Sequence, residues 1–247
     1  MQATRVLLDN GASARDKKLG GWQPLHKCCE VGNVQIAFLL LDAKAEVNSQ
    51  QDQGITPLYS AVHFGHADLT QLLVSNGANV NCTNEDGLSC LHLAAADGDA
   101  QIIKILVYGG ASMECRTSDG ETPLMTAITC QQVDSIHQLI KLGASVNSSS
   151  SNSDIAPLHL AAGVGRSDIV SMLLTAGADP HLLLSCGRPI HVAATGGNLS
   201  VIEQLLQHGV LPEIALNELD AGHGVHRQDI QRNHHAASAE LPACILR

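Results

Sequence analysis

Histidine and cysteine are the residues of this chain with the most versatile chemistry, and the sequence holds 13 histidines and 8 cysteines. Imidazoles and thiolates bind transition metals and also serve in acid–base and nucleophilic catalysis. Four histidines stand two residues after a proline or a cysteine in similar short motifs, at His26, His92, His159 and His191. They are 66, 67 and 32 residues apart, as expected of equivalent positions in a repeated unit. Equivalent positions in successive layers cannot converge on one metal ion, so we expect these four to be structural.

A second group of histidines lies near the C-terminus, where His223 and His226 are followed by the pair His234 and His235 and then by Cys244. This spacing matches no closed zinc pattern, and no framework would hold the ligands together. We therefore predict no metal site and no cofactor.

Motifs of known enzyme classes are missing from the sequence. The segment Gly163-Val164-Gly165 lacks the preceding strand and the third glycine of a dinucleotide-binding loop. Neither the nucleophile elbow of the hydrolases nor a P-loop occurs. The sequence therefore predicts a non-catalytic protein.

The elements that would position any functional group are short helices, which are clearest between residues 54 and 81. Thr56 can cap a helix that has Pro57 in its first turn, where the missing N–H costs nothing, and Gly65 can end that helix. A second helix carries leucines at helical spacing and ends at Gly77. Two short helices make only one thin layer, so neighbouring copies must cover their apolar faces.

This unit recurs along the chain. The glycines that end the second helices are 33, 33, 34 and 32 residues apart, at Gly77, Gly110, Gly143, Gly177 and Gly209. The first helices share a motif that reads PLH at Pro24, TPLY at Thr56, CLHLAA at Cys90, TPLM at Thr122, PLHLAA at Pro157 and PIHVAA at Pro189. In its period and its motif the chain resembles the ankyrin repeat family.

The resemblance implies an all-α repeat solenoid, a stack of helix–turn–helix units whose loops resemble β-hairpins. We expect the array to cover residues 1–212 and to be followed by a non-repetitive, disordered tail at 213–247. The array is expected to begin with a half repeat at 1–15 and to continue with full repeats at about 16–48, 49–81, 82–114, 115–147, 148–181 and 182–212. In this family the histidine of the shared motif bonds to nearby backbone and fixes the loop.

Two places depart from the regular pattern. The half repeat is a second helix without its first helix, which leaves Val6, Leu7 and Leu8 without a partner. The chain is then either a fragment or shorter isoform of a longer array, or an array that uses this helix as a cap. In the fourth repeat Gln131 replaces the glycine between the two helices, so we expect that corner either to be slightly strained or to use a different turn.

Composition excludes several kinds of partner. A formal net charge of -10 argues against nucleic acid, whose binding needs a basic surface that releases counterions. No apolar run approaches the roughly 18 residues that span a bilayer, so we expect no membrane insertion.

The cysteines fall at unrelated repeat positions in a chain long enough to fold without disulfides. We therefore expect reduced thiols in an intracellular monomer, located in the cytoplasm or the nucleus.

The resemblance implies a protein–protein interaction module, and partners in this family are usually bound by the hairpin tips and the ends of the first helices. The residues at these positions are Trp22, Val31, Ile55, His63, Phe64, Leu88, Asp97 and Glu121, with Asp52, Glu85, Asp86 and Asp119 at the rim. Interfaces depend on a few apolar anchors, while rim charges steer approach, so we predict an amphipathic and basic partner segment. In the other interpretation Trp22 only covers its neighbour, because isolated exposed apolar residues are ordinary.

Two further expectations depend on the same resemblance. The alternative function is a regulatory or substrate-recruiting part of a larger enzyme, such as a ubiquitin ligase subunit, a kinase or an acyltransferase. Asn48 follows Glu46-Val47 and stands eight residues after Leu40, and this context resembles that of asparagines modified by the oxygen-sensing asparaginyl hydroxylase. Asn81 and Asn147 lack the acidic residue.

Overall fold

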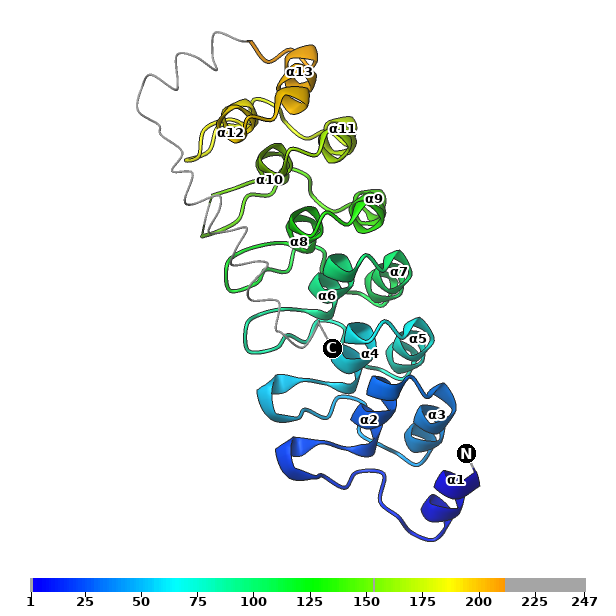
Figure 1. The fold of residues 1–247 in the computed structure, drawn as a ribbon. Coiled ribbons are helices and arrows are strands. Elements are labelled where there is room, and N and C mark those ends of the chain that lie inside the picture. The colour runs from blue at the N-terminus through cyan, green and yellow to red at the C-terminus, as the bar shows by residue number, and fades with distance from the viewer. Residues whose placement is uncertain (1, 153, 212–247) are drawn as a thin grey trace. The chain divides into compact units, whose positions relative to one another are not determined.

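The computed structural model describes residues 2–152 and 154–211, and these ranges form α-helices joined by turns and loops (Figure 1). Extended pairing within them is limited to two isolated β-bridges, one between Thr83 and Ser89 and one between Leu184 and Gly187. The predicted all-α repeat class is confirmed. The chain divides into two compact units, Met1–Ser118 and Asp119–Arg247.

The first unit begins with α1 (Gln2–Asp9) and continues with three pairs of helices. These are α2 (Pro24–Val31) with α3 (Val34–Asp42), α4 (Pro57–His63) with α5 (Ala67–Ser75), and α6 (Cys90–Asp97) with α7 (Ala100–Tyr108). First helices contact first helices, α2 with α4 and α4 with α6, while α3 contacts α1 and α5, and α5 contacts α7. The unit is therefore two layers of helices. Two 3-10 helices, η1 (Leu19–Gly21) and η2 (Asp52–Gly54), lie in the hairpin loops that precede α2 and α4.

The second unit repeats this arrangement. Its pairs are α8 (Pro123–Thr129) with α9 (Val133–Leu142), α10 (Pro157–Val164) with α11 (Ser167–Thr175), and α12 (Pro189–Gly196) with α13 (Leu199–Gln207). Helix α10 contacts α8 and α12, and α11 contacts α9 and α13. The predicted repeat boundaries stay a prediction, and the predicted tail at 213–247 lies outside the described residues.

The first helices start where the sequence predicts. The side-chain oxygen of Thr56 accepts a hydrogen bond from Tyr59 N, which satisfies one of the free N–H groups at the start of α4. The shared histidines reinforce the same corner. The backbone N–H of Ser89 donates to Nδ1 of His92 at 3.2 Å, and Gln23 and Arg188 donate in the same way to the histidines three residues on.

These histidines also fix the next loop along the stack. His26 Nε2 lies 3.2 Å from the carbonyl oxygen of Ile55, and His159 Nε2 lies 3.0 Å from that of Gly187. Burial lowers the pKa of His159 to about 4, so this imidazole is neutral at neutral pH. The predicted structural role of the repeated histidines is confirmed.

Every first helix contributes one leucine or isoleucine to the core of its unit. In the first unit Leu25, Leu58 and Leu91 are at most 1% exposed, and in the second Leu124, Leu158 and Ile190 are at most 2% exposed. Full burial of such a side chain stabilises the fold by about 2–3 kcal/mol. Alanines three residues later, such as Ala61 and Ala127, are 0% exposed and let adjacent first helices approach closely.

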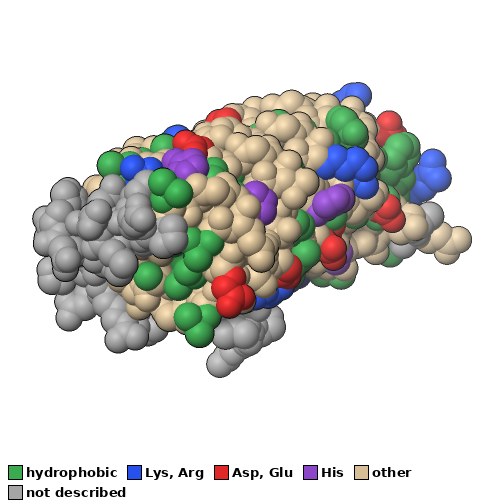
Figure 2. Space-filling model, turned by 90° about the horizontal axis from the view of Figure 1, so that it is seen from above, with side chains coloured by type: hydrophobic (Ala, Val, Ile, Leu, Met, Phe, Trp, Pro, Cys, Tyr) green, Lys and Arg blue, Asp and Glu red, His purple; other side chains and the backbone are tan. Residues whose placement is uncertain are grey.

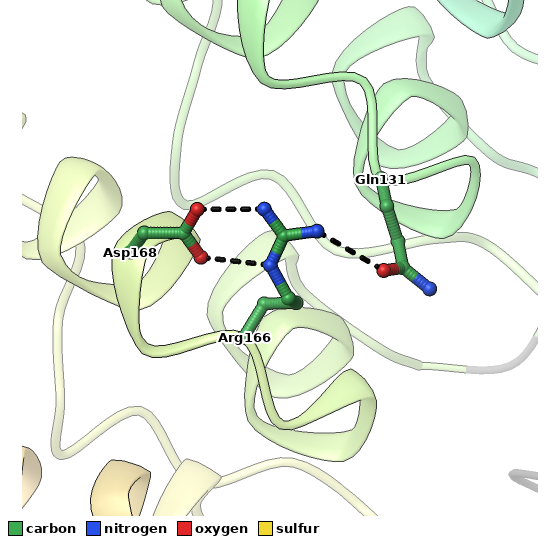
Figure 3. A network of polar contacts seen from close by, with 3 residues as sticks. All are labelled: Gln131, Arg166 and Asp168. Carbon is green, nitrogen blue, oxygen red and sulfur yellow. Dashed lines mark hydrogen bonds and ion pairs between the residues drawn. The ribbon is translucent and has the colours of Figure 1, made fainter.

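The corner at Gln131 is strained, the first of the two predicted outcomes. Gln131 has φ 56, in the left-handed region where the equivalent turns have glycine. Its side chain forms a contact with the next repeat (Figure 3): Arg166 Nη1 donates to Gln131 Oε1 at 3.2 Å. The same guanidinium donates through Nε and Nη2 to the carboxylate of Asp168, at 2.9 and 2.7 Å. This exposed network holds the corner, although such ion pairs stabilise a fold by at most about 1 kcal/mol.

Helix α1 leaves its apolar side open, as its sequence predicts. Val6 is 57% exposed and Leu7 is 61% exposed, while Leu8 is half-buried. Within the first unit, α1 packs mainly against α3.

Candidate functional site

The ends of the first helices in the first unit expose apolar side chains, as the sequence predicts. Val31, the last residue of α2, is 65% exposed, and Phe64, directly after α4, is 45% exposed. Because α2 and α4 are adjacent, both side chains emerge at the same end of the first-helix layer. A side chain that binds a partner must be available in this way.

Two histidines hold the Phe64 ring. His63 meets it edge-on, with ring centroids 4.9 Å apart and planes at 78°, and His66 stacks on it at 6.5 Å and 24°. His66 is in turn fixed, because its Nε2 lies 3.2 Å from the carbonyl oxygen of Glu30 in α2. A β-carbon at Gly32 would lie 2.7 Å from the His66 ring, so the glycine makes room for this contact. The Phe64 ring is therefore held by His63 and His66, and His66 is itself bonded to α2 of the preceding repeat.

Asp97 adds an acidic group from the next first helix, since it is the last residue of α6 and is exposed. Desolvation raises the pKa of Asp97, and the nearby His63 imidazole acts against that shift. The four side chains Val31, His63, Phe64 and Asp97 form what we call the first-helix surface.

The predicted hairpin residues of the first unit are less available. Trp22 is half-buried and packs edge-on against His26, with centroids 5.8 Å apart and planes at 68°. Ile55 and Leu88 are also half-buried. The geometry of Trp22 therefore supports the interpretation in which it covers its neighbour.

The predicted acidic rim is partly described. Glu85 and Asp86 are exposed at the third hairpin, while the side chain of Asp52 lies outside the described residues. Asp119 and Glu121 belong to the second unit. Burial, together with the neighbouring Asp119 carboxylate, raises the pKa of Glu121 to about 7. Their place in a partner site stays a prediction.

Three asparagines at one repeat position join consecutive repeats, a role that sequence reasoning missed. Asn48 Nδ2 donates to the carbonyl oxygen of Gly77 at 3.1 Å, and its Oδ1 accepts from the backbone N–H of Asn79 at 2.7 Å. The same two bonds recur from Asn81 to Gly110 and Ser112, at 3.1 and 2.9 Å, and from Asn147 to Gly177 and Asp179, at 3.1 and 2.9 Å. The signal in the sequence is an Asn about 29 residues before the glycine that ends the next second helix. Asn48 is thus a structural residue as well as a predicted modification site.

A serine, a histidine and a cysteine meet at the start of α6. The Ser89 hydroxyl lies 2.8 Å from His92 Nδ1 and 3.3 Å from Cys115 Sγ, which is itself 3.8 Å from the imidazole. Burial raises the pKa of Cys115, so the thiol is not activated, and His92 is 0% exposed. The group therefore fits a packed corner better than a nucleophilic site. Within the described ranges no cluster of His, Cys, Asp or Glu could hold a metal ion.

A second apolar surface lies on the outer helices α5 and α7, where the sequence predicts no site. A shallow groove of about 310 Å³, here called the outer groove, is lined by Gln71, Val74, Gln101, Lys104, Ile105, Tyr108 and Gly109. Tyr108 is 81% exposed, and Phe38 on α3 is 59% exposed. The signal in the sequence that could have indicated this groove is the aromatic residue Tyr108 on the polar side of α7.

The surface has no strongly basic region on the face drawn in Figure 2, where Lys and Arg side chains are scattered among uncharged and acidic ones. No helix in the described part of the chain has the length and apolar character needed to cross a membrane.

Comparisons with known proteins agree with the fold. A family model described as ankyrin repeats (3 copies) matches residues 1–84, 58–150 and 91–184, and one described as ankyrin repeat matches residues 188–217. No curated protein matches the sequence. Among solved structures, the chain is similar to the crystal structure of the ankyrin repeat domain of Bcl-3, described as a unique member of the IkappaB protein family. The two share 25% sequence identity at a TM-score of 0.72, over 77% of this chain and 88% of that chain. Domains of this kind are generally protein-binding modules and are typically non-catalytic, and this chain belongs to the ankyrin repeat family.

Proposed function

We propose that the first-helix surface binds an apolar and basic segment of a partner protein. The observation that supports this proposal is the pair of exposed apolar side chains, Val31 and Phe64, on adjacent helices of one compact unit. An aromatic ring that is already fixed by its neighbours loses little conformational entropy on binding, which favours Phe64 as the anchor.

The charges near this surface favour a basic partner. Asp97 belongs to the surface, Glu85 and Asp86 are exposed on the hairpin that precedes α6, and the whole chain carries a formal net charge of -10. Such charges accelerate the approach of a basic segment more than they tighten the final complex. We propose that the partner segment places apolar side chains on Val31 and Phe64 and directs Lys or Arg towards Asp97.

The hairpin residues Trp22, Ile55 and Leu88 have a smaller part in this proposal, because each is half-buried within the unit. Asp52 of the first unit, and Asp119 and Glu121 of the second unit, stay proposed partner-binding residues, each considered within its own unit. As parts of the same proposal, the chain acts as a monomer in the cytoplasm or nucleus, which size measurements and imaging of tagged protein can test.

The binding role would be the same if the array served a larger enzyme as its regulatory or substrate-recruiting part. A longer transcript that encodes a catalytic or ligase-recruiting segment would establish this alternative, and it would leave the binding surface unchanged.

The test is a peptide-display selection against the full chain, followed by affinity measurements on variants. Phe64→Ala should weaken the selected peptides by about 30-fold or more, which corresponds to about 2 kcal/mol. Tyr108→Ala is the matched control, because it removes an exposed aromatic ring from the outer groove. Neutralising Asp97 should mainly slow association at low salt.

The proposal predicts that selected peptides are basic and apolar and lose affinity with Phe64→Ala but not with Tyr108→Ala. The opposite pattern, in a folded Phe64→Ala variant, would assign binding to the outer groove and overturn the proposal.

A further inference from the structure

Two thiols meet at the base of the third hairpin, the loop of residues 82–89, because Cys90 is the first residue of α6. Cys82 Sγ and Cys90 Sγ lie 3.9 Å apart. Cys82 and Cys90 directly flank the isolated antiparallel β-bridge between Thr83 and Ser89. The two cysteines therefore face each other across the base of one hairpin.

This position suits a disulfide. Directly opposite residues of an antiparallel pair have Cα atoms about 4.5–5.5 Å apart, and disulfides span about 4.4–6.8 Å between Cα atoms. The hairpin is held independently, because the backbone N–H of Asn84 donates to the carbonyl oxygen of Leu88 at 3.1 Å. The paired residues Thr83 and Ser89 directly adjoin the two cysteines, whose sulfur atoms are 3.9 Å apart. A bond between them requires the sulfur atoms to approach to about 2.05 Å.

We propose that Cys82 and Cys90 form a peroxide-reactive dithiol, which oxidises to a disulfide that closes the third hairpin. In the first step the Cys82 thiolate attacks a peroxide oxygen, the O–O bond breaks, and Cys82 becomes a sulfenic acid while the peroxide leaves as an alcohol or water. In the second step the Cys90 thiol attacks the Cys82 sulfur, and the S–O bond breaks. The hydroxyl leaves as water with the Cys90 proton. Two thiols are oxidised and one peroxide is reduced.

The surroundings of the two sulfur atoms assign these roles. A hydrogen bond from Cys90 lowers the pKa of Cys82 to about 7, and the Thr56 hydroxyl, 3.4 Å from Cys82 Sγ, acts in the same direction. The same contact and burial raise the pKa of Cys90. Cys82 is therefore the attacking thiolate, and Cys90 keeps its proton until it resolves the sulfenic acid.

Burial limits which oxidants can react. Cys82 is 9% exposed and Cys90 is 0% exposed, so the third hairpin must open locally before a peroxide reaches the sulfur. A small oxidant such as hydrogen peroxide should react, whereas a bulky thiol reagent should react slowly. Cys28 and Cys29 provide an internal comparison, because burial raises the pKa values of these neighbouring thiols to about 11 and about 12.

The experiment treats the reduced full chain with hydrogen peroxide, removes the peroxide, unfolds the chain, blocks the remaining thiols by alkylation and maps them by mass spectrometry. Cleavage at Glu85 or Asp86 separates the two cysteines, so a disulfide joins two peptides. We expect this bridge, with the loss of two hydrogen atoms and reversal by dithiothreitol, while Cys28 and Cys29 stay alkylated. In Cys90→Ser the reaction should stop at a Cys82 sulfenic acid that dimedone captures. In Cys82→Ser, Cys90 should stay reduced.

The wild-type chain alone can overturn the proposal, which matters if a variant does not fold. The proposal is wrong if Cys82 and Cys90 stay reduced at a peroxide dose that oxidises Cys28 or Cys29. A bridge from Cys82 to Cys115 in place of Cys90 would also overturn it, because the two-strand geometry of the hairpin would then not be what brings the sulfur atoms together.

Discussion

Gly109, just after α7, lies so close to Val74 of α5 that a β-carbon on Gly109 would be 2.8 Å from Val74 Cγ1. Gly109 has φ -76, which any residue adopts, so its backbone does not require glycine. The contact between the two helices is instead made possible by the missing side chain. The equivalent residues in other repeats include Asn76 and Leu142, which carry side chains at this position.

This contact predicts a coupling between the two positions. Gly109→Ala should lower the free energy of unfolding by about 1–2 kcal/mol, because the new methyl group overpacks the contact with Val74. In a Val74→Ala background the same substitution should cost little, since the clashing methyl group is gone. Urea denaturation of the four chains measures this double-mutant cycle, and additive effects would contradict the steric explanation.

Lys44 has φ 64 at the position where five other repeats end their second helix with glycine. Lys44→Gly should raise the free energy of unfolding by about 0.5–1 kcal/mol, because a left-handed conformation costs a lysine more than a glycine. Gly77→Ala is the matched control, with φ 82 and no atom within 4 Å of the added β-carbon. It should be destabilising by about 1 kcal/mol for conformational reasons alone. A destabilising Lys44→Gly would contradict the prediction.

Glu121 predicts a pH-dependent stability. Since burial raises its pKa from 4.5 to about 7, the folded state binds the proton more tightly than the unfolded state. The stability of the wild-type chain should therefore fall, through this group, as pH rises from about 4.5 to about 7. Glu121→Gln should stabilise the chain by about 1–3 kcal/mol at pH 8 and have little effect at pH 4. The exposed Glu85→Gln should change little at either pH, and an equal effect of Glu121→Gln at both would contradict the assignment.

Asn48 is predicted to be hydroxylated by the asparaginyl hydroxylase before Asn81 and Asn147. Both ends of its amide are bonded to the next repeat, so the enzyme must act on a locally opened chain. Mass spectrometry of protein from oxygenated cells should find the added oxygen on Asn48 first. Complete peptide coverage without it, in cells that hold active enzyme, would end this prediction.

The fold could be predicted because the same helix start and end signals recur in successive repeats. Thr56 and Pro57 mark a helix start, Gly65 and Gly77 mark helix ends, and each signal depends on local backbone chemistry. The irregular corner expected at Gln131 followed from the same logic. The partner in its compensating contact, Arg166, could not be predicted, because that contact depends on how consecutive repeats are spaced.

The candidate site was predicted less completely. Exposure of Val31 and Phe64 followed from their repeat positions, but the partial burial of Trp22 depends on its contact with His26. The thiol pair could not be predicted from the repeat period, because Cys82 and Cys90 meet across one hairpin and not between equivalent positions. The exposed Tyr108 was not among the predicted residues, because those came from the hairpin tips and the ends of the first helices.

Each bond that an asparagine of this chain donates to the next repeat depends on one amide nitrogen, which deamidation would remove. Deamidation of Asn48 replaces its Nδ2 donor with a carboxylate oxygen, which can only accept hydrogen bonds. That oxygen would then oppose the carbonyl of Gly77, now 3.1 Å from the nitrogen, and two acceptors at that distance repel. A change of one atom and one charge would thus replace a hydrogen bond between two repeats with a repulsive contact, with no change in the core.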